Sequence, residues 1–182
     1  DADKERIDKR IWDLFGEEWC VMFTDLSGFS RGVAEFGIIH FLQTIYESER
    51  LLIPVIEEHD GILLKAEGDS LMVIFRNVFK ALQCGLEMQK VLKSYNADKP
   101  DEEKIILCMG LGWGRVLRIG DMDVFGSEVN AASKLGEDMA GSWEILVTGA
   151  VREKAAGAPG IEFVRAEDTP PGADSAYRVI IG

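Results

Sequence analysis

Two short apolar runs stand between two long helical stretches, and this order restricts the fold more than any other feature of the chain. The runs, residues 61–66 and 70–75, are joined by a Glu-Gly-Asp turn and predict a β-hairpin. The stretch before it, Phe29 to His59, has apolar residues at helical spacing, although Pro54 should perturb its last turns. The stretch after it, Val78 to Tyr95, predicts a second helix.

Extended segments flank this central part of the chain. Residues 19–24 predict a buried strand before the first helix, and residues 104–113 and 115–119 are expected to be extended after the second helix. The order βαββαβ is typical of an α+β fold with a ferredoxin-like core, in which an antiparallel sheet carries helices on one face. Further elements are expected beyond this core: a helix at residues 126–139 and strands at residues 144–148 and 176–180.

The N-terminal residues form a separate predicted element. Ile7, Ile11 and Leu14 recur at spacings of three and four between charged residues, which predicts an amphipathic helix that ends at Gly16. We expect residues 1–16 to be a linker helix and residues 17–182 to be one compact domain. Because the first residue is Asp, we also expect a regulatory region of a longer protein to precede it.

Composition limits the partners of this domain. The chain has 20 Lys and Arg against 32 Asp and Glu, a formal net charge of −12, which disfavours binding to nucleic acid or to an anionic membrane surface. Its apolar stretches are far shorter than the roughly 20 residues that span a bilayer. Three cysteines in apolar runs indicate reduced thiols. We therefore expect a cytoplasmic domain without direct membrane contact, which is compatible with a membrane tether elsewhere in a longer protein.

Two aspartates follow or precede predicted strands at turns. In the expected topology the first and third strands are antiparallel neighbours, so Asp25 and Asp69 should meet at one edge of the sheet. Their carboxylates, with the carbonyl oxygen of Leu26, could bind divalent cations. Read singly, each Asp is more typical of a turn.

The turn after Asp25 leads into the first long helix. Backbone N–H groups of Ser27, Gly28 and Phe29 could bind phosphate oxygens at the start of that helix, which makes these residues candidate substrate contacts. A simple helix-entry turn explains the same residues equally well.

Four further polar residues are candidates for the site. Lys65 is the only charge in its apolar run and either snorkels from a sheet edge or meets a buried acceptor. Asp123 precedes the predicted helix at residues 126–139, where it could also be a turn residue or an anion near a helix N-terminus. Asn130 and Lys134 are four residues apart and share a face of that helix, which could be an ordinary solvated face.

Taken together, these fragments resemble a known family. FTDLSGFS (23–30), LLKAEGDSLMVIF (63–75), GWGRV (112–116) and DVFGSEVNAASKL (123–135), in this order, are similar to motifs of class III nucleotidyl cyclase catalytic domains. The resemblance runs from about residue 19 to the C-terminus. It implies a head-to-tail homodimer with catalytic sites at the interface, converting a nucleoside triphosphate into a 3′,5′-cyclic monophosphate and pyrophosphate.

The resemblance also implies roles for individual residues. Asp25 and Asp69 would bind two Mg²⁺ or Mn²⁺ ions, while Lys65 and Asp123 of the other subunit would read the base. Asp accepts from the adenine amino group and Lys donates to a ring nitrogen, whereas guanine reverses both polarities, so this pair favours ATP. The resemblance therefore predicts an adenylate cyclase.

Two departures from the family pattern leave alternatives open. Asn130 would orient the ribose, but Lys134 stands where the family usually has an arginine that contacts the triphosphate, and a lysine cannot make the bidentate contact. The segment EFVRAEDTPPGADSAYRV, where the family commonly has a further lysine, contains only Arg165 and Arg178 as cations. The alternatives are a cyclase for GTP or a pyrimidine nucleotide, a weakly active or silent nucleotide-binding module, and an interaction domain that binds no nucleotide.

Overall fold

The computed structural model of the chain describes residues 1–27 and 29–182, and the side chains of all of these except residues 29–34. The elements of the predicted core are β1 (Gly16–Leu26), α2 (Phe29–Glu58), β2 (Ile62–Glu67), β3 (Ser70–Phe75), α3 (Val78–Asn96) and β4 (Leu107–Ile119). These are preceded by α1 (Ala2–Phe15), and a short 3₁₀ turn, η1 (Asp101–Glu103), lies between α3 and β4. The remaining elements are β5 (Asp123–Phe125), α4 (Ser127–Lys134), the π-helical turn η2 (Leu135–Met139), β6 (Ile145–Thr148), α5 (Gly149–Lys154), β7 (Ile161–Arg165) and β8 (Ala176–Ile181).

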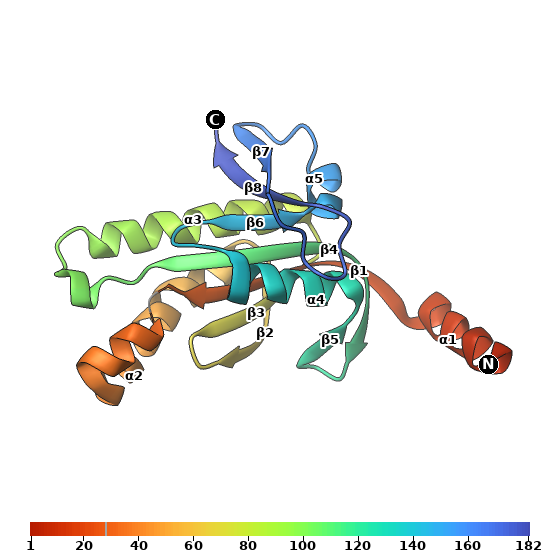
Figure 1. Ribbon diagram of the computed structural model, residues 1–182, viewed down its shortest axis with the longest axis horizontal. Helices are drawn as coiled ribbons and strands as arrows, with labels where there is room; N and C mark the ends of the chain where they lie inside the picture. The colour runs from red at the N-terminus through yellow and green to blue at the C-terminus, as the bar shows by residue number, and fades with distance from the viewer. Residues whose placement is uncertain (28) are drawn as a thin grey trace.

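One sheet runs through the whole domain, in the order β2-β3-β1-β4-β6-β8-β7, with β5 paired to β4. The four strands of the βαββαβ unit are antiparallel throughout, so the predicted ferredoxin-like core is confirmed. Beyond it, β6 joins β4 in parallel, and the hairpin of β7 and β8 completes the sheet. Figure 1 shows this hairpin next to α5 at the upper side of the molecule.

Helices cover both faces of the sheet. Cys20 and Met22 of β1 face a core that includes residues of α2 and α3, as the prediction of helices on one face requires. Val21 of the same strand faces the opposite side, where it belongs to a cluster with Val129 and Ala132 of α4. The additional helix expected after the core therefore covers the other face.

Helix α4 lies unusually close to β4 because the strand has glycine at every second position facing it. A Cβ atom on Gly110 would come within 2.4 Å of the backbone nitrogen of Gly136, and one on Gly112 within 2.4 Å of the carbonyl oxygen of Glu128. On Gly114 it would come within 2.9 Å of Cγ of Glu128. The alternating glycines thus leave a surface of β4 without side chains, against which the backbone of α4 packs directly.

The predicted helix at residues 126–139 is present in two parts. Helix α4 ends at Lys134, and the π-helical turn η2 follows it, closed by a 2.7 Å bond from the N–H of Ala140 to the carbonyl of Leu135. Gly136 lies against β1, where a Cβ atom would come within 2.6 Å of the carbonyl oxygen of Phe23. The π-helical turn η2 therefore lies where the backbone of Gly136 packs closely against β1, and sequence periodicity does not reveal this contact.

Helix α2 differs from its prediction in where it is irregular. It continues through Pro54 to Glu58, because Leu52 and Ile56 around the proline are buried in the core and hold the helix in place. Its non-helical φ/ψ lies at Gly37, with φ 85° and ψ 174°, a backbone conformation that glycine adopts without steric cost.

The N-terminal helix α1 is present as predicted, and none of its residues is buried. Figure 1 shows it projecting from the body of the domain. Its end is held by Arg115 of β4, which donates to the carbonyls of Trp12 and Gly16, and by a contact between the rings of Trp12 and Phe125. Within residues 1–27 and 29–182, no helix has the length and apolar character needed to cross a membrane.

Candidate active site

Asp25 and Asp69 lie side by side at the edge where β1 ends and β3 begins. Thr24 of β1 is paired with Leu71 of β3, so the residues at the two strand ends are neighbours. The two carboxyl groups are close enough for Asp69 to raise the pKa of Asp25. The expectation that the antiparallel register would bring them together is confirmed.

The electrostatic surroundings of Asp25 are acidic. Burial and the neighbouring Asp69 raise the pKa of Asp25 to about 8. The negative charge of Glu137 makes a smaller contribution, which also raises this pKa. The N–H of Leu26 donates to Asp25 Oδ1 at 3.0 Å, and this hydrogen bond lowers the pKa of Asp25. Every charged group in this set is a carboxylate, so the site has a deficit of positive charge.

A divalent cation fits this deficit. Carboxylate and carbonyl oxygens are the ligands that Mg²⁺ prefers, and Asp25, Asp69 and the carbonyl of Leu26 supply such oxygens. Among the described residues, no group of three or more His, Cys, Asp or Glu side chains could hold a metal ion by itself. Mg²⁺ usually keeps several waters and takes further oxygens from substrate phosphates, so an open site of this kind is typical of it.

The turn after β1 only partly matches its predicted phosphate-binding role. The N–H of Ser27 donates to the carbonyl of Ile106 at 2.8 Å, and its hydroxyl lies 2.7 Å from that of Ser142. The backbone N–H of Ser27 is therefore already used, in contrast to the expectation. Gly28 lies outside the described residues, and Phe29 is the first residue of α2, where its side chain is not described.

A β-bulge directs Lys65 toward the face that carries α4. Leu63 is paired with Val73 but Lys65 is paired with Met72, so the register shifts between them. Met72 belongs to the cluster on the α4 face, and Val73 belongs to the core on the opposite face. Since directly paired residues share a face, the bulge moves Lys65 from the α2–α3 side to the α4 side.

On that face Lys65 meets Asp123. The distance from Lys65 Nζ to Asp123 Oδ2 is 3.6 Å, and Glu67 Oε1 lies at the same distance from Nζ. The other oxygen of Asp123 accepts a 2.9 Å hydrogen bond from the N–H of Val124. The two residues expected to read the base are therefore brought together by strands β2 and β5, which do not pair with each other.

Asn130 and Lys134 project from the exposed side of α4. Both are solvent-exposed, whereas Ala131 and Ala132 between them are buried. Lys134 Nζ lies 3.0 Å from Asp138 Oδ2, so the only ion pair assigned to it within the described residues is with a carboxylate of η2. Both polar groups are available to a ligand that approaches α4 from outside.

Sequence reasoning missed two acidic residues near this site. Glu137 accepts a hydrogen bond from Ser70, the residue after Asp69, at 3.3 Å. Glu128 lies between α4 and the sheet, where it binds backbone and side-chain donors. The period-two glycines of GLGWG were the available signal for the second, because they indicate a close approach of another element to β4.

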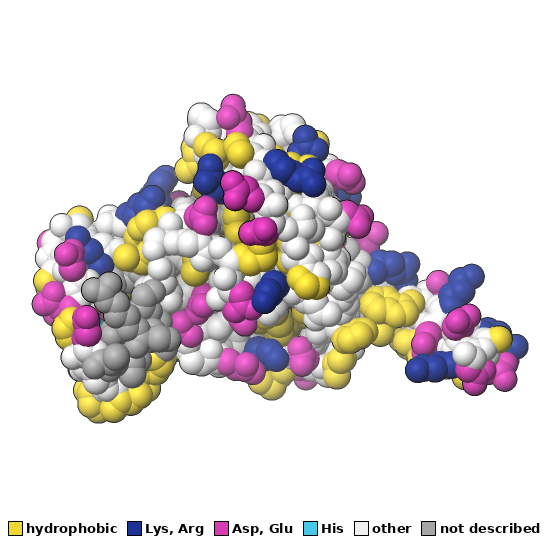
Figure 2. Space-filling model, in the orientation of Figure 1, with side chains coloured by type: hydrophobic (Ala, Val, Ile, Leu, Met, Phe, Trp, Pro, Cys, Tyr) yellow, Lys and Arg dark blue, Asp and Glu magenta, His cyan; other side chains and the backbone are white. Residues whose placement is uncertain are grey.

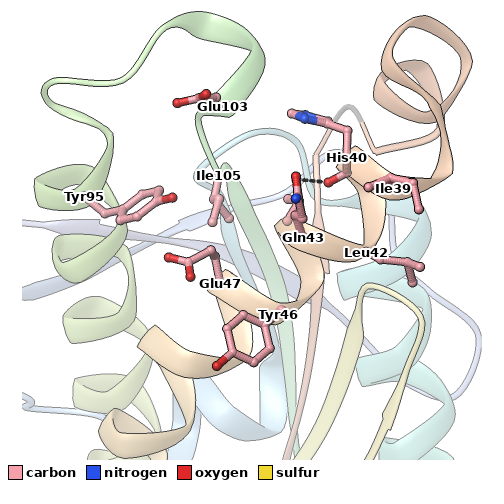
Figure 3. A pocket seen from close by; sticks show the side chains of 10 residues that line it. Ile39, His40, Leu42, Gln43, Tyr46, Glu47, Tyr95, Glu103 and Ile105 are labelled. Carbon is pink, nitrogen blue, oxygen red and sulfur yellow. Dashed lines mark hydrogen bonds between the residues drawn. The ribbon is translucent and has the colours of Figure 1, made fainter.

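A cavity of about 520 Å³ lies away from these residues, between α2, the end of α3 and η1. Figure 3 shows Tyr95, Glu47 and Glu103 around it on one side and His40 on the other. The exposed apolar side chains of α2 flank it and contribute to the yellow area beside the grey residues in Figure 2. Within the part of the chain that the structure describes, the residues that line this cavity include none of the candidate site residues.

Comparison with known proteins gives a family match over most of the chain. A model of the adenylate and guanylate cyclase catalytic domain matches residues 16–170. The chain is 30% identical over 131 residues to the serine/threonine-protein kinase pkn2 of Myxococcus xanthus, covering 72% of this chain and 16% of that protein. It is 28% identical over 116 residues to putative adenylate cyclase 3 of Rhizobium meliloti (strain 1021), covering 64% of this chain and 19% of that protein. The chain thus spans less than a fifth of the length of these two relatives.

Solved structures share the fold. The adenylyl cyclase CyaB from P. aeruginosa superposes with a TM-score of 0.74 at 20% identity, covering 92% of this chain and 95% of that chain. The guanylate cyclase domain of RhGC from Catenaria anguillulae, in complex with GTP, gives 0.76 at 15% identity, with coverages of 91% and 97%. A rhodopsin-guanylyl cyclase core with converted specificity, in complex with ATPalphaS, gives 0.77 at 17% identity, with coverages of 92% and 97%.

Proposed function

Because the chain belongs to the family of adenylate and guanylate cyclase catalytic domains, we propose that it converts ATP to 3′,5′-cyclic AMP and pyrophosphate in intracellular signal transduction. The observation that supports ATP is the pair of Lys65 and Asp123, whose charged groups are 3.6 Å apart. The Asp carboxylate would accept from the amino group of adenine, and the Lys ammonium would donate to ring N1. Guanine offers the opposite polarities, and a mispaired buried polar group discriminates strongly.

Two divalent cations, Mg²⁺ or Mn²⁺, are the cofactors in this proposal. Asp25, Asp69 and the carbonyl of Leu26 would hold them, and the acidic surroundings of Asp25 support this assignment. When bound, the cations would lower the pKa of the ribose 3′-hydroxyl and neutralise charge on the departing pyrophosphate.

The chain's own residues would mainly position the substrate. Cyclisation requires the 3′ oxygen in line with the α-phosphorus, and Asn130 would hold the ribose in this orientation. Lys134 would donate to the triphosphate as negative charge develops. We assign further phosphate contacts to the turn at Ser27, Gly28 and Phe29, with the N–H groups of the last two as donors, because the N–H of Ser27 already donates to Ile106.

We further propose that each active site is shared between two copies of the chain. Asp25 is paired with Cys108 near the start of β4, whereas Asp123 is paired with Ile119 at its other end. Asn130 and Lys134 are exposed on α4, as residues that serve a partner's substrate must be. A head-to-tail homodimer would bring the metal-binding edge of one copy to the base- and ribose-binding residues of the other.

Two features support a linker to a regulatory region and a cytoplasmic location for this domain. The family match begins at residue 16, directly after α1 ends at Phe15, which supports our assignment of residues 1–16 to a linker from a regulatory region and of residues 17–182 to the catalytic domain. The cysteines Cys20, Cys84 and Cys108 are buried and free, which fits a reducing cytoplasm, where ATP is also available.

One observation favours a second candidate. Lys134 replaces the family's arginine and is already paired with Asp138, so its contact with a triphosphate would be weaker than a bidentate one. A nucleotide-binding module with low or no turnover would have this property. A cyclase for GTP or a pyrimidine nucleotide is a rival within the same chemistry, and it would require a different reading of the base by Lys65 and Asp123.

The test is direct. The 182-residue chain is incubated separately with ATP, GTP, CTP and UTP in the presence of Mn²⁺, and cyclic products are identified by mass spectrometry. We expect cyclic AMP to be the main product. Preferential formation of another cyclic nucleotide would overturn the base assignment, and nucleotide binding without any cyclic product would favour the silent module.

A further inference from the structure

Glu128 connects α4 to two strands of the sheet through one carboxylate oxygen. Its Oε1 accepts a hydrogen bond from the backbone N–H of Trp113 in β4 at 3.0 Å. The same oxygen accepts a 2.6 Å bond from the hydroxyl of Thr148, the last residue of β6. Thr148 is fully buried, and its hydroxyl in turn accepts from the N–H of Val151 at the start of α5.

The N–H of Trp113 has a particular need for this acceptor. Met109 donates to Glu144 on the β6 side of β4, and every second N–H of a strand points to the same side, so the N–H of Trp113 points there too. The pairing of β4 with β6 ends at Leu111 and Val147. Glu128 therefore continues the hydrogen bonding of β4 at the position where β6 stops.

The backbone around Glu128 leaves it little room to move. A Cβ atom on Gly112 or Gly114 would collide with Glu128 atoms, so the first turn of α4 rests directly on the strand. Burial raises the pKa of the Glu128 carboxyl, and this effect is opposed by the two hydrogen bonds. The Glu128 carboxylate can accept both hydrogen bonds only when α4 has one particular rotation about its axis.

That rotation decides what α4 presents to solvent. At 100° per residue, Asn130 lies about 200° around the helix from Glu128, and Lys134 about 240°. Both are therefore on the side opposite to the anchored carboxylate, in agreement with their exposure. An anchor on the sheet side fixes the direction in which the two outer side chains point.

We propose that Glu128 is a positioning residue for the cyclase reaction, which fixes α4 through Trp113 and Thr148 and so aligns Asn130 and Lys134 with the substrate. This inference rests on the proposed function, because Asn130 and Lys134 have a substrate only within it. Glu128 itself does not contact the nucleotide. Its contribution is to hold α4 so that Asn130 and Lys134 are aligned with the substrate.

Kinetics of three variants test this role. Glu128→Ala removes the acceptor and should lower kcat on the order of tenfold, with a much smaller change in KM, because misaligned Asn130 and Lys134 lose contacts that matter most in the transition state. Glu128→Gln keeps an oxygen that can accept both bonds and should restore most of the activity. Glu153→Gln, a matched change at an exposed glutamate of α5, should match wild type. Equal kcat values for Glu128→Ala and wild type, measured well below their unfolding temperatures, would overturn the proposal.

Thr148 provides a second arm of the test. Thr148→Val should lower kcat in the same way, whereas Thr148→Ser retains the hydroxyl and should not. If the two residues act as one unit, the double variant Glu128→Ala/Thr148→Val loses no more than the worse single variant. Fully additive losses would contradict a shared role.

Hydrogen exchange separates this inference from the proposed function. Amide protons in α4 should exchange faster in Glu128→Ala than in wild type or in Glu153→Gln. If wild type forms no cyclic product from any nucleotide, the proposed function fails, and the exchange data still report whether Glu128 anchors α4. If wild type is active but α4 exchanges identically in all variants, only the role of Glu128 fails.

Discussion

The ammonium of Lys65 lies 3.6 Å from the carboxylate of Asp123, although their strands, β2 and β5, are separated in the sheet by three others. The bulge in β2 and the folding of β5 back along β4 are both required for this contact. A donor and an acceptor are thereby held next to each other, as the proposed reading of an adenine edge requires.

Exchange of these polarities should change the preferred nucleotide. Lys65→Glu with Asp123→Asn places an acceptor opposite the N1–H of guanine and a donor opposite its O6. We expect the ratio of kcat/KM for ATP to that for GTP to fall by about a hundredfold or more. Glu67→Gln is the matched control, because it removes the other carboxylate near Lys65 and should leave the ratio unchanged. A ratio that stays constant in the double variant would rule out base reading by this pair.

If Asp25 and Asp69 bind the metal ions, removal of either carboxylate should abolish turnover without unfolding the chain. Asp25→Ala and Asp69→Ala should each reduce cyclic nucleotide formation by about three orders of magnitude or more. The unfolding temperature at pH 7 should be unchanged or higher, because each substitution removes or reduces the cost of keeping Asp25 protonated beside Asp69 in the folded state. Asp98→Ala, at an exposed site after α3, serves as the control. Undiminished product from both single variants would exclude these residues as metal ligands.

Binding of Mn²⁺ should release a proton at neutral pH. The pKa of Asp25 is raised from 3.8 to about 8, chiefly by burial and then by Asp69, so the metal-free site is protonated at pH 7 and must lose this proton to bind a cation. Calorimetric titrations in two buffers of different ionisation enthalpy should therefore give different apparent enthalpies at pH 7 and equal ones at pH 9.5. Asp25→Asn should remove the difference at pH 7.

The same shift predicts how pH affects the stability of the metal-free chain. A carboxyl with a raised pKa in the folded state contributes stability that is fully present below about pH 4 and is lost as pH rises through about 8. Unfolding by denaturant should thus show a smaller pH-dependent loss between pH 5 and pH 8 in Asp25→Asn than in wild type. An identical pH profile for the two chains would show that Asp25 titrates normally.

Complementation tests whether the sites are shared between subunits. Asp25→Ala and Asn130→Ala chains should each be inactive alone, because each lacks one half of every site. Mixed in equal amounts with free exchange, half of the dimers would be heterodimers with one intact site of two, so about a quarter of wild-type activity should return. Absence of recovery in samples where heterodimers are demonstrated by mass spectrometry would indicate that each chain builds its site alone.

How much of this arrangement is visible in the sequence depends on whether a feature is local. The order βαββαβ and the meeting of Asp25 with Asp69 follow from periodicity and from the antiparallel register that this order imposes. The bulge that turns Lys65 toward Asp123 cannot be read in this way, because an apolar run with one lysine fits either register. The anchoring of Glu128 depends on the contact of α4 with β4, which sequence periodicity does not report beyond the alternating glycines.

Lys134 stands where the resemblance leads us to expect an arginine, and its ion pair with Asp138 makes its proposed role testable. If Lys134 contacts the triphosphate in the transition state, Lys134→Ala should lower kcat by about tenfold to a hundredfold, the effect of losing one charge-assisted hydrogen bond, with a smaller change in KM. Lys134→Arg should equal or exceed wild type, since a guanidinium can bind two phosphate oxygens at once. Asp138→Asn removes the competing carboxylate at 3.0 Å and should lower KM for the nucleotide, because substrate no longer has to displace an ion pair. Steady-state kinetics at saturating Mn²⁺ measure all three effects. If kcat is the same in wild type, Lys134→Ala and Lys134→Arg, the lysine is only one half of a surface ion pair, and the phosphates must be held by other groups.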